Sequence, residues 1–365
     1  MMIVLSHLNF LGVGGTLTGR IYPYIDNAYI ALDYFFLLSG FGMSLREQTA
    51  GYYRPAPGIK GAAGFAWHKV RKLYPLYIIT MLVMMPYAIA VLMDDYSPIA
   101  VLAITAARII VCAPLLQTLT GFVQFSHAFN SVCWFYSSLA FLYFVYPWLS
   151  RLMRKTKKGR TSSAIRLVIL TGLYAVAYIG AKTVESITPF NILSYESPFT
   201  RIFVFLIGME LSNIYLQLKQ RNFHKCEPGK TLGTVMELAA IAVMTFWWVI
   251  RGKAAGIIGK GEASAVALIL SDLLVAALTL MVFSFESGVV SKILSRHLPA
   301  ALGSAAMYIY MIHYPITRYM EALVNYTNPP IGIRWAAVAI IMAATISLSL
   351  LIYRKDTLGE ECQLL

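Results

Sequence analysis

The chain has 365 residues, of which 58% are hydrophobic and only 13% are charged, and its net charge is +13. Its mean hydropathy is +0.66, and a soluble domain carries about 25% charged residues, so the composition excludes an ordinary soluble protein. The basic residues lie in loops between apolar runs, where they orient a membrane protein, and therefore indicate no nucleic-acid partner.

Apolar runs recur from one end of the chain to the other, and most approach the ~20 residues that a helix needs to cross a bilayer. They are continuously apolar, whereas strands of a membrane β-barrel alternate. The fold class that we expect is therefore all-α, a polytopic membrane helical bundle forming a single domain over residues 1–365. Eleven runs lie near residues 1–14, 27–45, 73–93, 98–119, 132–150, 164–182, 201–218, 232–250, 264–285, 301–322 and 332–353.

The loops between these runs predict the orientation, because loops rich in Lys and Arg stay in the cytoplasm. Three loops are expected there: 46–72 with six Lys or Arg, 151–166 with seven, and 219–230 with four. Residues 183–200 and 325–330 contain neither Lys nor Arg and suit the outside. One loop, 251–262 with Arg251, Lys253 and Lys260, disagrees weakly with this alternation.

The run at 98–119 conflicts with the crossing count. Two cytoplasmic loops need an even number of crossings between them, but three apolar runs separate 46–72 from 151–166. We expect 98–119 to be re-entrant or interfacial, because Arg108 lies within it and Pro114 follows. The prediction is then ten full spans with both termini cytoplasmic, in a plasma membrane.

The first run is short, because its residues reach only ~21 Å as a helix against a hydrocarbon core of ~30 Å. We expect either that the true start lies upstream or that the chain begins with half a span. No signal peptide is expected, since a charged region and a small-residue cleavage site are both lacking. The four cysteines, which show no metal or disulfide spacing, are Cys112, Cys133, Cys226 and Cys362.

Two ionisable residues, His7 and Asp33, lie inside apolar runs. Such groups cost about 2.5–3.5 kcal/mol each on insertion scales and usually mark a functional site. They belong to a series of aromatic and charged motifs: "LDYFFLLSGF" at 32–41, "WHKVRKLYPLY" at 67–77, "WFYSSLAFLYFVYP" at 134–147, "ESPFTRIFVFLIGMEL" at 196–211 and "YIYMIHYPI" at 308–316. The small residues Ser39 and Gly40 are typical of close helix approach.

In this order, the motifs resemble the acyltransferase 3 family of membrane acyltransferases over nearly the whole chain. The resemblance implies transfer of an acyl group, often acetyl from acetyl-CoA or another acyl-CoA donor, to a carbohydrate hydroxyl, for example O-acetylation of a cell-envelope polysaccharide. No metal is expected. His7 matches the essential histidine of the family, Asp33 its acidic residue before Phe-Phe-x-x-Ser-Gly-Phe, and Arg201 the arginine of its Pro-x-x-Arg pattern.

The expected chemistry gives these residues roles. His7 is the general base, since an imidazole is suited to proton transfer near neutral pH; the alternative is a structural histidine between helices. Asp33 orients His7 or forms an ion pair with a nearby Lys or Arg. Arg201 holds the oxyanion, a phosphate or the acceptor, or it is a snorkelling cation at a span end. Trp134 and His313 are expected to contact substrate, with backbone bridging as the alternative for His313.

The cations Lys69, Arg71 and Lys72 are the expected contacts of the CoA phosphates, because they lie at the cytoplasmic face. The alternative is that they only anchor the span. Lys69 and Lys72 occupy positions where the family has arginines ahead of Tyr-Pro.

The chain departs from the family at two places. The family's arginine before the histidine would fall four positions before Met1. Leu139 and Ala140 stand where the family often has glutamates after the Trp that matches Trp134. These departures indicate a divergent subgroup and leave a non-catalytic relative of the fold open. A secondary transporter or lipid flippase would also explain ionisable residues in spans, but the sequence shows no inverted repeat.

Overall fold

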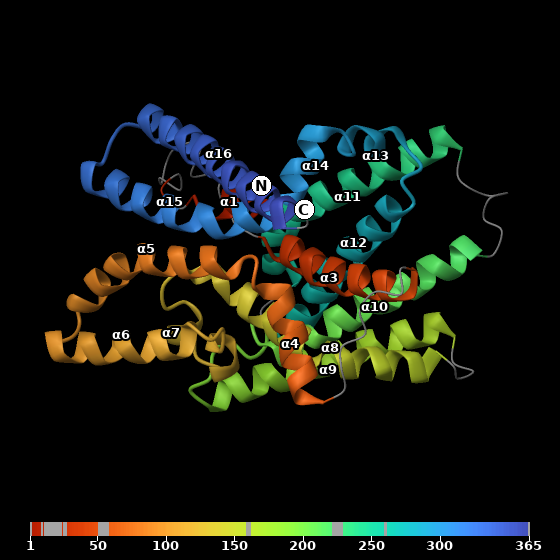
Figure 1. Cartoon of the computed structure of the whole chain (residues 1–365), viewed down its shortest axis with the longest axis horizontal. Helices are drawn as coiled ribbons and strands as arrows, with labels where there is room; N and C mark the ends of the chain where they lie inside the picture. The colour runs from red at the N-terminus through yellow and green to blue at the C-terminus, as the bar shows by residue number, and fades with distance from the viewer. Residues whose placement is uncertain are drawn as a thin grey trace. The chain divides into compact units, whose positions relative to one another are not determined.

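The computed structural model describes residues 2–8, 10, 24, 28–49, 58–157, 162–220, 229–258 and 261–363. Over these residues every regular element is a helix (Figure 1), which confirms the all-α membrane bundle. Some basic residues of the predicted cytoplasmic loops, such as Arg54 and Arg160, lie outside the described residues. Cys112 and Cys133 are buried and free, and Cys226 also lies outside the described residues.

Seven of the described helices are long and apolar enough to cross a membrane. They are α5 (Tyr74–Met93), α8 (Trp134–Lys157), α9 (Ser163–Ile187), α10 (Pro198–Gln220), α11 (Lys230–Ile258), α12 (Glu262–Ser284) and α16 (Ile331–Gln363). Two more, α3 (Tyr29–Thr49) and α15 (Ala306–Thr327), have 21 and 22 residues, but charged side chains such as Asp33 and Arg318 interrupt them. The count of ten spans remains a prediction.

The run at 98–119 forms the 15-residue helix α6 (Pro98–Cys112), followed by η2 (Gln117–Thr120) and α7 (Val123–Ser126). Ser97 caps the start of α6 by accepting a hydrogen bond from the Ala100 amide at 3.4 Å. The helix ends just before Pro114, which cannot continue it. It is therefore ~22 Å long, shorter than the ~30 Å hydrocarbon core. This length supports the re-entrant or interfacial placement, which remains a prediction.

The chain divides into two compact units, each assembled from separate stretches of sequence. The first unit comprises Met1–Asn27, Val70–Tyr136 and Ser295–Leu365, and the second comprises Ala28–Lys69 and Ser137–Leu294. The first unit also contains α1 (Met2–Ser6), η3 (Ser131–Cys133) and α14 (His297–Ser304), and the second contains α13 (Val289–Leu294) and nearly all of α4 (Ile59–Val70). The single membrane domain expected over the whole chain remains a prediction.

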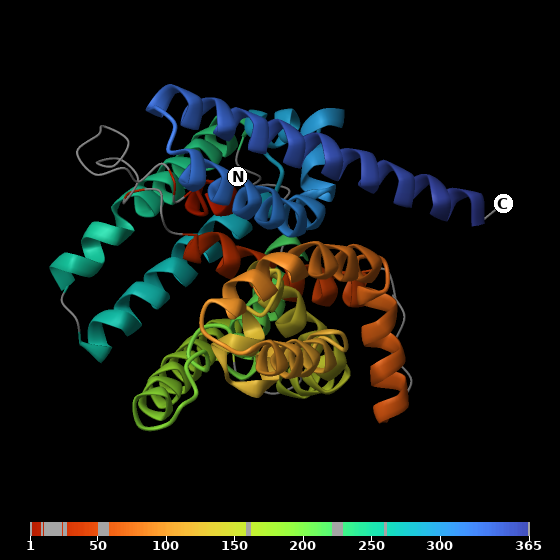
Figure 2. The ribbon, with the colours of Figure 1, turned by 90° about the vertical axis from the view of Figure 1, so that its left-hand side faces the viewer.

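In the first unit, α15 and α16 lie side by side as a hairpin, drawn in blue in Figure 2. The turn begins at Asn328, which has a left-handed backbone with φ 43° and donates its amide to the Val324 carbonyl at 2.9 Å, as helix C-terminal caps do. Pro329 and Pro330 follow and end the helix. Arg334 of α16 then donates to the Asn328 side-chain oxygen at 2.9 Å.

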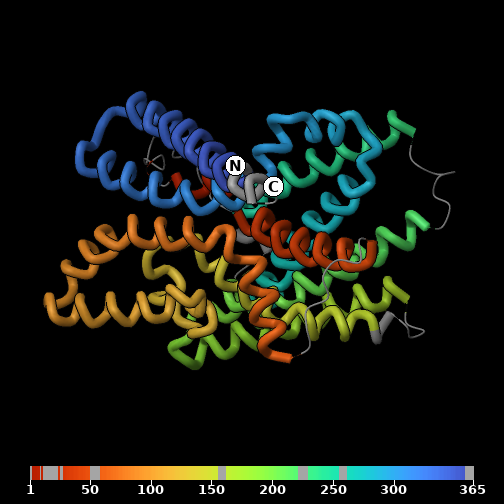
Figure 3. The backbone as a smooth tube through the Cα atoms, viewed as in Figure 1, coloured from red at the N-terminus to blue at the C-terminus, as the bar shows by residue number. Residues whose placement is uncertain are grey.

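The short helix α1 packs against this hairpin, although 299 residues lie between the end of α1 at Ser6 and the start of α15 at Ala306. Figure 3 shows the red start of the chain beside the blue end. The contact is an apolar cluster formed by Val4, Leu8, Phe10, Ile309, Val324, Ala337, Val338 and Ile341. Arg334 also donates to the Phe10 carbonyl at 2.8 Å. These contacts fix the segment that carries His7.

In the second unit, α3 and α10 approach each other closely at two glycines. A Cβ added to Gly40 would overlap the Phe205 carbonyl, and one added to Gly208 would overlap the Leu37 carbonyl. Gly42, on the same helix as Gly40, would meet nothing within 4 Å. The expectation that small residues allow close helix approach is therefore confirmed at Gly40.

Candidate active site

His7 directly follows α1, where the chain leaves the helix. Its ring Nδ1 lies 2.7 Å from the Ile3 carbonyl oxygen. A carbonyl only accepts, so in the neutral ring the proton is on Nδ1. The other nitrogen, Nε2, then carries a lone pair, as a general base requires.

His313 of α15 is completely buried and lies beside His7. Its Nε2 is 3.5 Å from His7 Nδ1, and the two ring centroids are 5.2 Å apart. His313 Nδ1 lies 3.2 Å from the Ile309 carbonyl oxygen, so in the neutral ring its Nε2 is an acceptor that faces His7. Tyr314 packs edge-on against His7, with ring centroids 5.7 Å apart. The first unit therefore brings together two residues that the sequence analysis selected separately.

Trp134 opens α8 in the same unit and is buried. The segment before it is fastened to α15. Asn130 Nδ2 donates to the Met311 carbonyl at 2.9 Å, and the Tyr310 hydroxyl donates to the Val132 carbonyl at 2.7 Å. This attachment holds the start of α8 against the helix that carries His313.

Asp33 and Arg201 form a buried ion pair in the second unit. Arg201 Nη1 lies 2.5 Å from Asp33 Oδ1, and their side chains are 0% and 2% exposed. Arg201 Nε donates to the Tyr195 carbonyl, and its guanidinium lies 3.8 Å from the centroid of the Tyr195 ring. Arg201 is not a snorkelling cation, because such a side chain keeps its charged group in water and none of the Arg201 side chain is exposed. The alternative role of Asp33, an ion pair with a nearby Lys or Arg, is therefore observed. Its expected role in orienting His7 remains a prediction.

A second buried ion pair lies in this unit and was not predicted from the sequence. Arg251 Nε lies 2.9 and 2.8 Å from the two carboxylate oxygens of Asp272, and Trp247 Nε1 donates to the same carboxylate at 2.7 Å. The Arg251 guanidinium lies 3.9 Å from the centroid of the Tyr29 ring. Arg251 is therefore neutralised inside the unit and does not act as a loop charge, whereas Lys253 and Lys260 of the same loop still count toward the positive-inside rule. Asp272, an acid within an apolar run, was the available signal.

The predicted phosphate-binding cations occupy the end of α4 and the turn that follows. Lys69 is partly buried and contributes to a pocket of ~410 Å³ in the second unit with Arg46, Glu47, Phe65 and others. Its Nζ lies 5.4 Å from the centroid of the Phe65 ring. Burial, and secondarily the charge of Arg46, lowers the pKa of Lys69. Arg71 is exposed and Lys72 partly exposed, as an anion site facing water requires.

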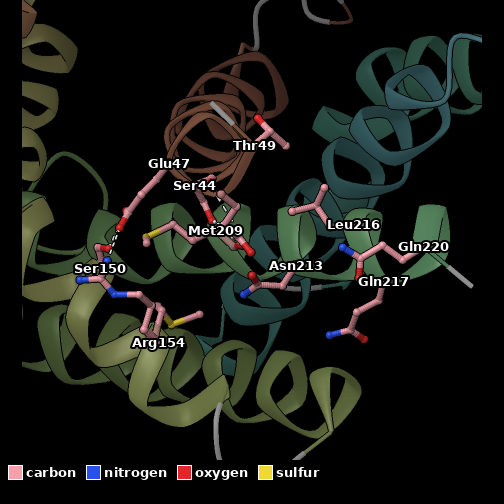
Figure 4. A pocket seen from close by; sticks show the side chains of 12 residues that line it. Ser44, Glu47, Thr49, Ser150, Arg154, Met209, Asn213, Leu216, Gln217 and Gln220 are labelled. Atoms are coloured by element: carbon pink, nitrogen blue, oxygen red, sulfur yellow. Dashed lines mark hydrogen bonds and ion pairs between the residues drawn. The ribbon is translucent and has the colours of Figure 1, made fainter. Parts of the chain in front are cut away.

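A larger pocket of ~590 Å³ lies in the second unit where α3, α8 and α10 end (Figure 4). Its anchor is Glu47, whose carboxylate accepts hydrogen bonds from the Tyr146 hydroxyl at 2.6 Å, the Ser150 hydroxyl at 2.6 Å and Arg154 Nη1 at 2.5 Å. The volume lies within the ~300–1,000 Å³ of small-molecule sites. The remaining polar lining is Ser44, Gln48, Thr49, Asn213, Gln217 and Gln220. The sequence analysis missed Glu47, because an acid beside Arg46 at a span end looks like an ordinary surface charge.

Comparison with known proteins supports one family. A family model described as an acyltransferase domain, of the acyltransferase 3 type, matches residues 1–354, which is essentially the whole chain. Neither the curated proteins nor the solved structures give a significant match.

Proposed function

The chain belongs to the acyltransferase 3 family of membrane acyltransferases, and from this premise we propose that it transfers an acyl group from acyl-CoA to a carbohydrate hydroxyl. Acetyl is the proposed acyl group, and a glycan of the bacterial cell envelope the proposed acceptor. We also propose that both termini lie in the cytoplasm, where the donor is found.

The observation that carries this proposal is the setting of His7. Its Nδ1 is held by the Ile3 carbonyl at 2.7 Å, so the lone pair on Nε2 is available to an acceptor hydroxyl. Proton transfer to a positioned base contributes typically 10²–10⁴-fold to a rate. The structural alternative, a histidine bonded between helices, would use only Nδ1, which both the Ile3 carbonyl and His313 Nε2 face, and would give Nε2 no task.

The reaction then proceeds in two proton transfers. His7 Nε2 takes the hydroxyl proton while the acceptor oxygen attacks the thioester carbonyl carbon. The tetrahedral intermediate collapses with cleavage of the carbon–sulfur bond, and the leaving sulfur takes the proton from His7 Nε2. The products are an acyl ester and free CoA, and His7 returns to its starting form.

The charged residues of the proposal have two tasks. Lys69, Arg71 and Lys72 hold the CoA phosphates by charge-assisted hydrogen bonds. Arg201 stabilises the oxyanion, and Asp33 holds the guanidinium in place. In support, Arg201 Nη2 is buried and has no hydrogen-bond partner among the residues that the structure describes, so one donor remains for an anionic oxygen. Trp134 and His313 belong to the first unit with His7.

The experiment is a transfer assay with the purified protein in detergent or liposomes. We expect radiolabelled acetyl from acetyl-CoA to appear in a glycan acceptor as an alkali-labile ester. Stoichiometric release of free CoA should accompany it. If label enters no candidate glycan and CoA release stays at the rate of the uncatalysed hydrolysis, the proposed reaction is wrong.

A further inference from the structure

We propose that His313 is a positioning residue, which holds His7 in its reactive tautomer and stabilises the His7 imidazolium formed during acyl transfer. This inference rests on the proposed function and adds to it a residue that does not touch the reacting atoms. It replaces a substrate contact as the expected role of His313.

The geometry gives His7 Nδ1 two acceptors. The Ile3 carbonyl oxygen lies 2.7 Å away and His313 Nε2 lies 3.5 Å away. His313 is itself fixed, because its Nδ1 lies 3.2 Å from the Ile309 carbonyl and its ring is edge-on to its neighbour Tyr314, at a centroid distance of 6.5 Å. A fixed lone pair therefore faces the only nitrogen of His7 that keeps its proton throughout the reaction.

The charges around His7 make such an acceptor necessary. The guanidinium of Arg318, on α15, is a positive charge in the surroundings of His7. Arg318 lies 5.0 Å from the centroid of the Tyr314 ring and is paired with Glu321 at 2.5 Å. No carboxylate in the described part of the first unit is hydrogen-bonded to His7. In a catalytic triad a carboxylate stabilises the histidine. Here the Ile3 carbonyl and His313 take that role.

His313 neither gains nor loses a proton during the reaction. The acceptor proton moves to His7 Nε2, which leaves the ring cationic with protons on both nitrogens. The Nδ1 proton stays in place between the Ile3 oxygen and His313 Nε2. When the sulfur leaves, the Nε2 proton goes to it, and both rings are again neutral.

The test measures kcat and kcat/KM for acyl transfer against pH in His313→Leu and His313→Gln. The leucine side chain removes the acceptor, so we expect a fall in kcat of about tenfold, since a hydrogen bond to a charged group is worth about that factor. We also expect the acidic limb of the profile to move to lower pH, because the imidazolium has lost a partner. Glutamine presents an amide oxygen near the position of Nε2. His313→Gln should therefore lose less of the rate than His313→Leu and should shift the acidic limb by less.

The matched control is His297→Gln, which changes an exposed histidine at the start of α14 in the same unit and should leave the acidic limb at its wild-type pH. If His313→Leu does not fold, His313→Met takes its place with the same expected shift. A folded variant without the acceptor that keeps the wild-type limb and kcat overturns the inference. The proposed function fails separately, if His7→Ala transfers acyl groups at the wild-type rate.

Discussion

The ion pair between Asp33 and Arg201 gives the sharpest test of the second unit. Its side chains are 0% and 2% exposed, so Asp33→Asn or Arg201→Gln alone leaves one charge buried without its partner. Breaking a buried pair in this way costs about 3–5 kcal/mol. The double substitution removes both charges, and its cost should fall to that of lost hydrogen bonds, about 0.5–1.5 kcal/mol each. The two single effects should therefore be far from additive, with a coupling of at least about 3 kcal/mol.

The assay combines denaturant unfolding in detergent with acyl transfer. We expect the double variant to recover most of the stability that each single variant loses but none of the activity, because the proposed oxyanion donor Arg201 is then absent. The pair Arg251 and Asp272 is the matched control, since it joins the same residue types with side chains 10% and 1% exposed but has no proposed catalytic role. Its double variant, Arg251→Gln with Asp272→Asn, should recover both stability and activity.

Two results would refute this reasoning. The first is a free energy of unfolding within about 1 kcal/mol of the wild type for a single variant of Asp33 or Arg201, which would show that no buried charge is left without its partner. A double variant that regains activity together with stability would show that the pair is structural and that Arg201 is not catalytic.

The remaining predictions concern helix packing and the donor. Gly40→Ala should destabilise the protein by about 1–3 kcal/mol or more, because its Cβ would meet the backbone of α10, whereas Gly42→Ala should be close to neutral; unfolding midpoints compare the two, and equal midpoints would contradict the close approach. Replacing Lys69, Arg71 and Lys72 by Gln should raise the KM for acetyl-CoA by about tenfold or more at low salt, and an unchanged donor KM in the correctly inserted fraction would remove these cations from the donor site. Because the pKa of Lys69 is lowered, donor affinity in the wild type should fall as pH rises, and do so at a lower pH than for an ordinary lysine.

The helices could be predicted because each depends mainly on its own sequence. Continuous apolar runs specify membrane helices, and Pro114 sets the end of α6 through its missing amide. Gly40 was identifiable as a contact because a glycine in an apolar helix commonly allows close packing. The structure places Gly208 opposite on α10.

The partners of the charged residues could not be predicted in the same way. Counting loop charges treats Arg251 as exposed, whereas it is paired with Asp272 on the next helix. Glu47 and Arg154 lie 107 residues apart, and His7 and His313 lie 306 apart. Such pairs depend on which helices pack together and in which rotation, and a single sequence does not specify that.

The chemistry of His7 is the central claim, and one measurement tests it most directly. His7→Ala is purified with the wild-type protein, normalised for folded protein, and both are given labelled acetyl-CoA and the same glycan. If His7 is the base, transfer falls by at least about 10²-fold while yield and unfolding midpoint stay close to those of the wild type. Transfer by folded His7→Ala at the wild-type rate would contradict it.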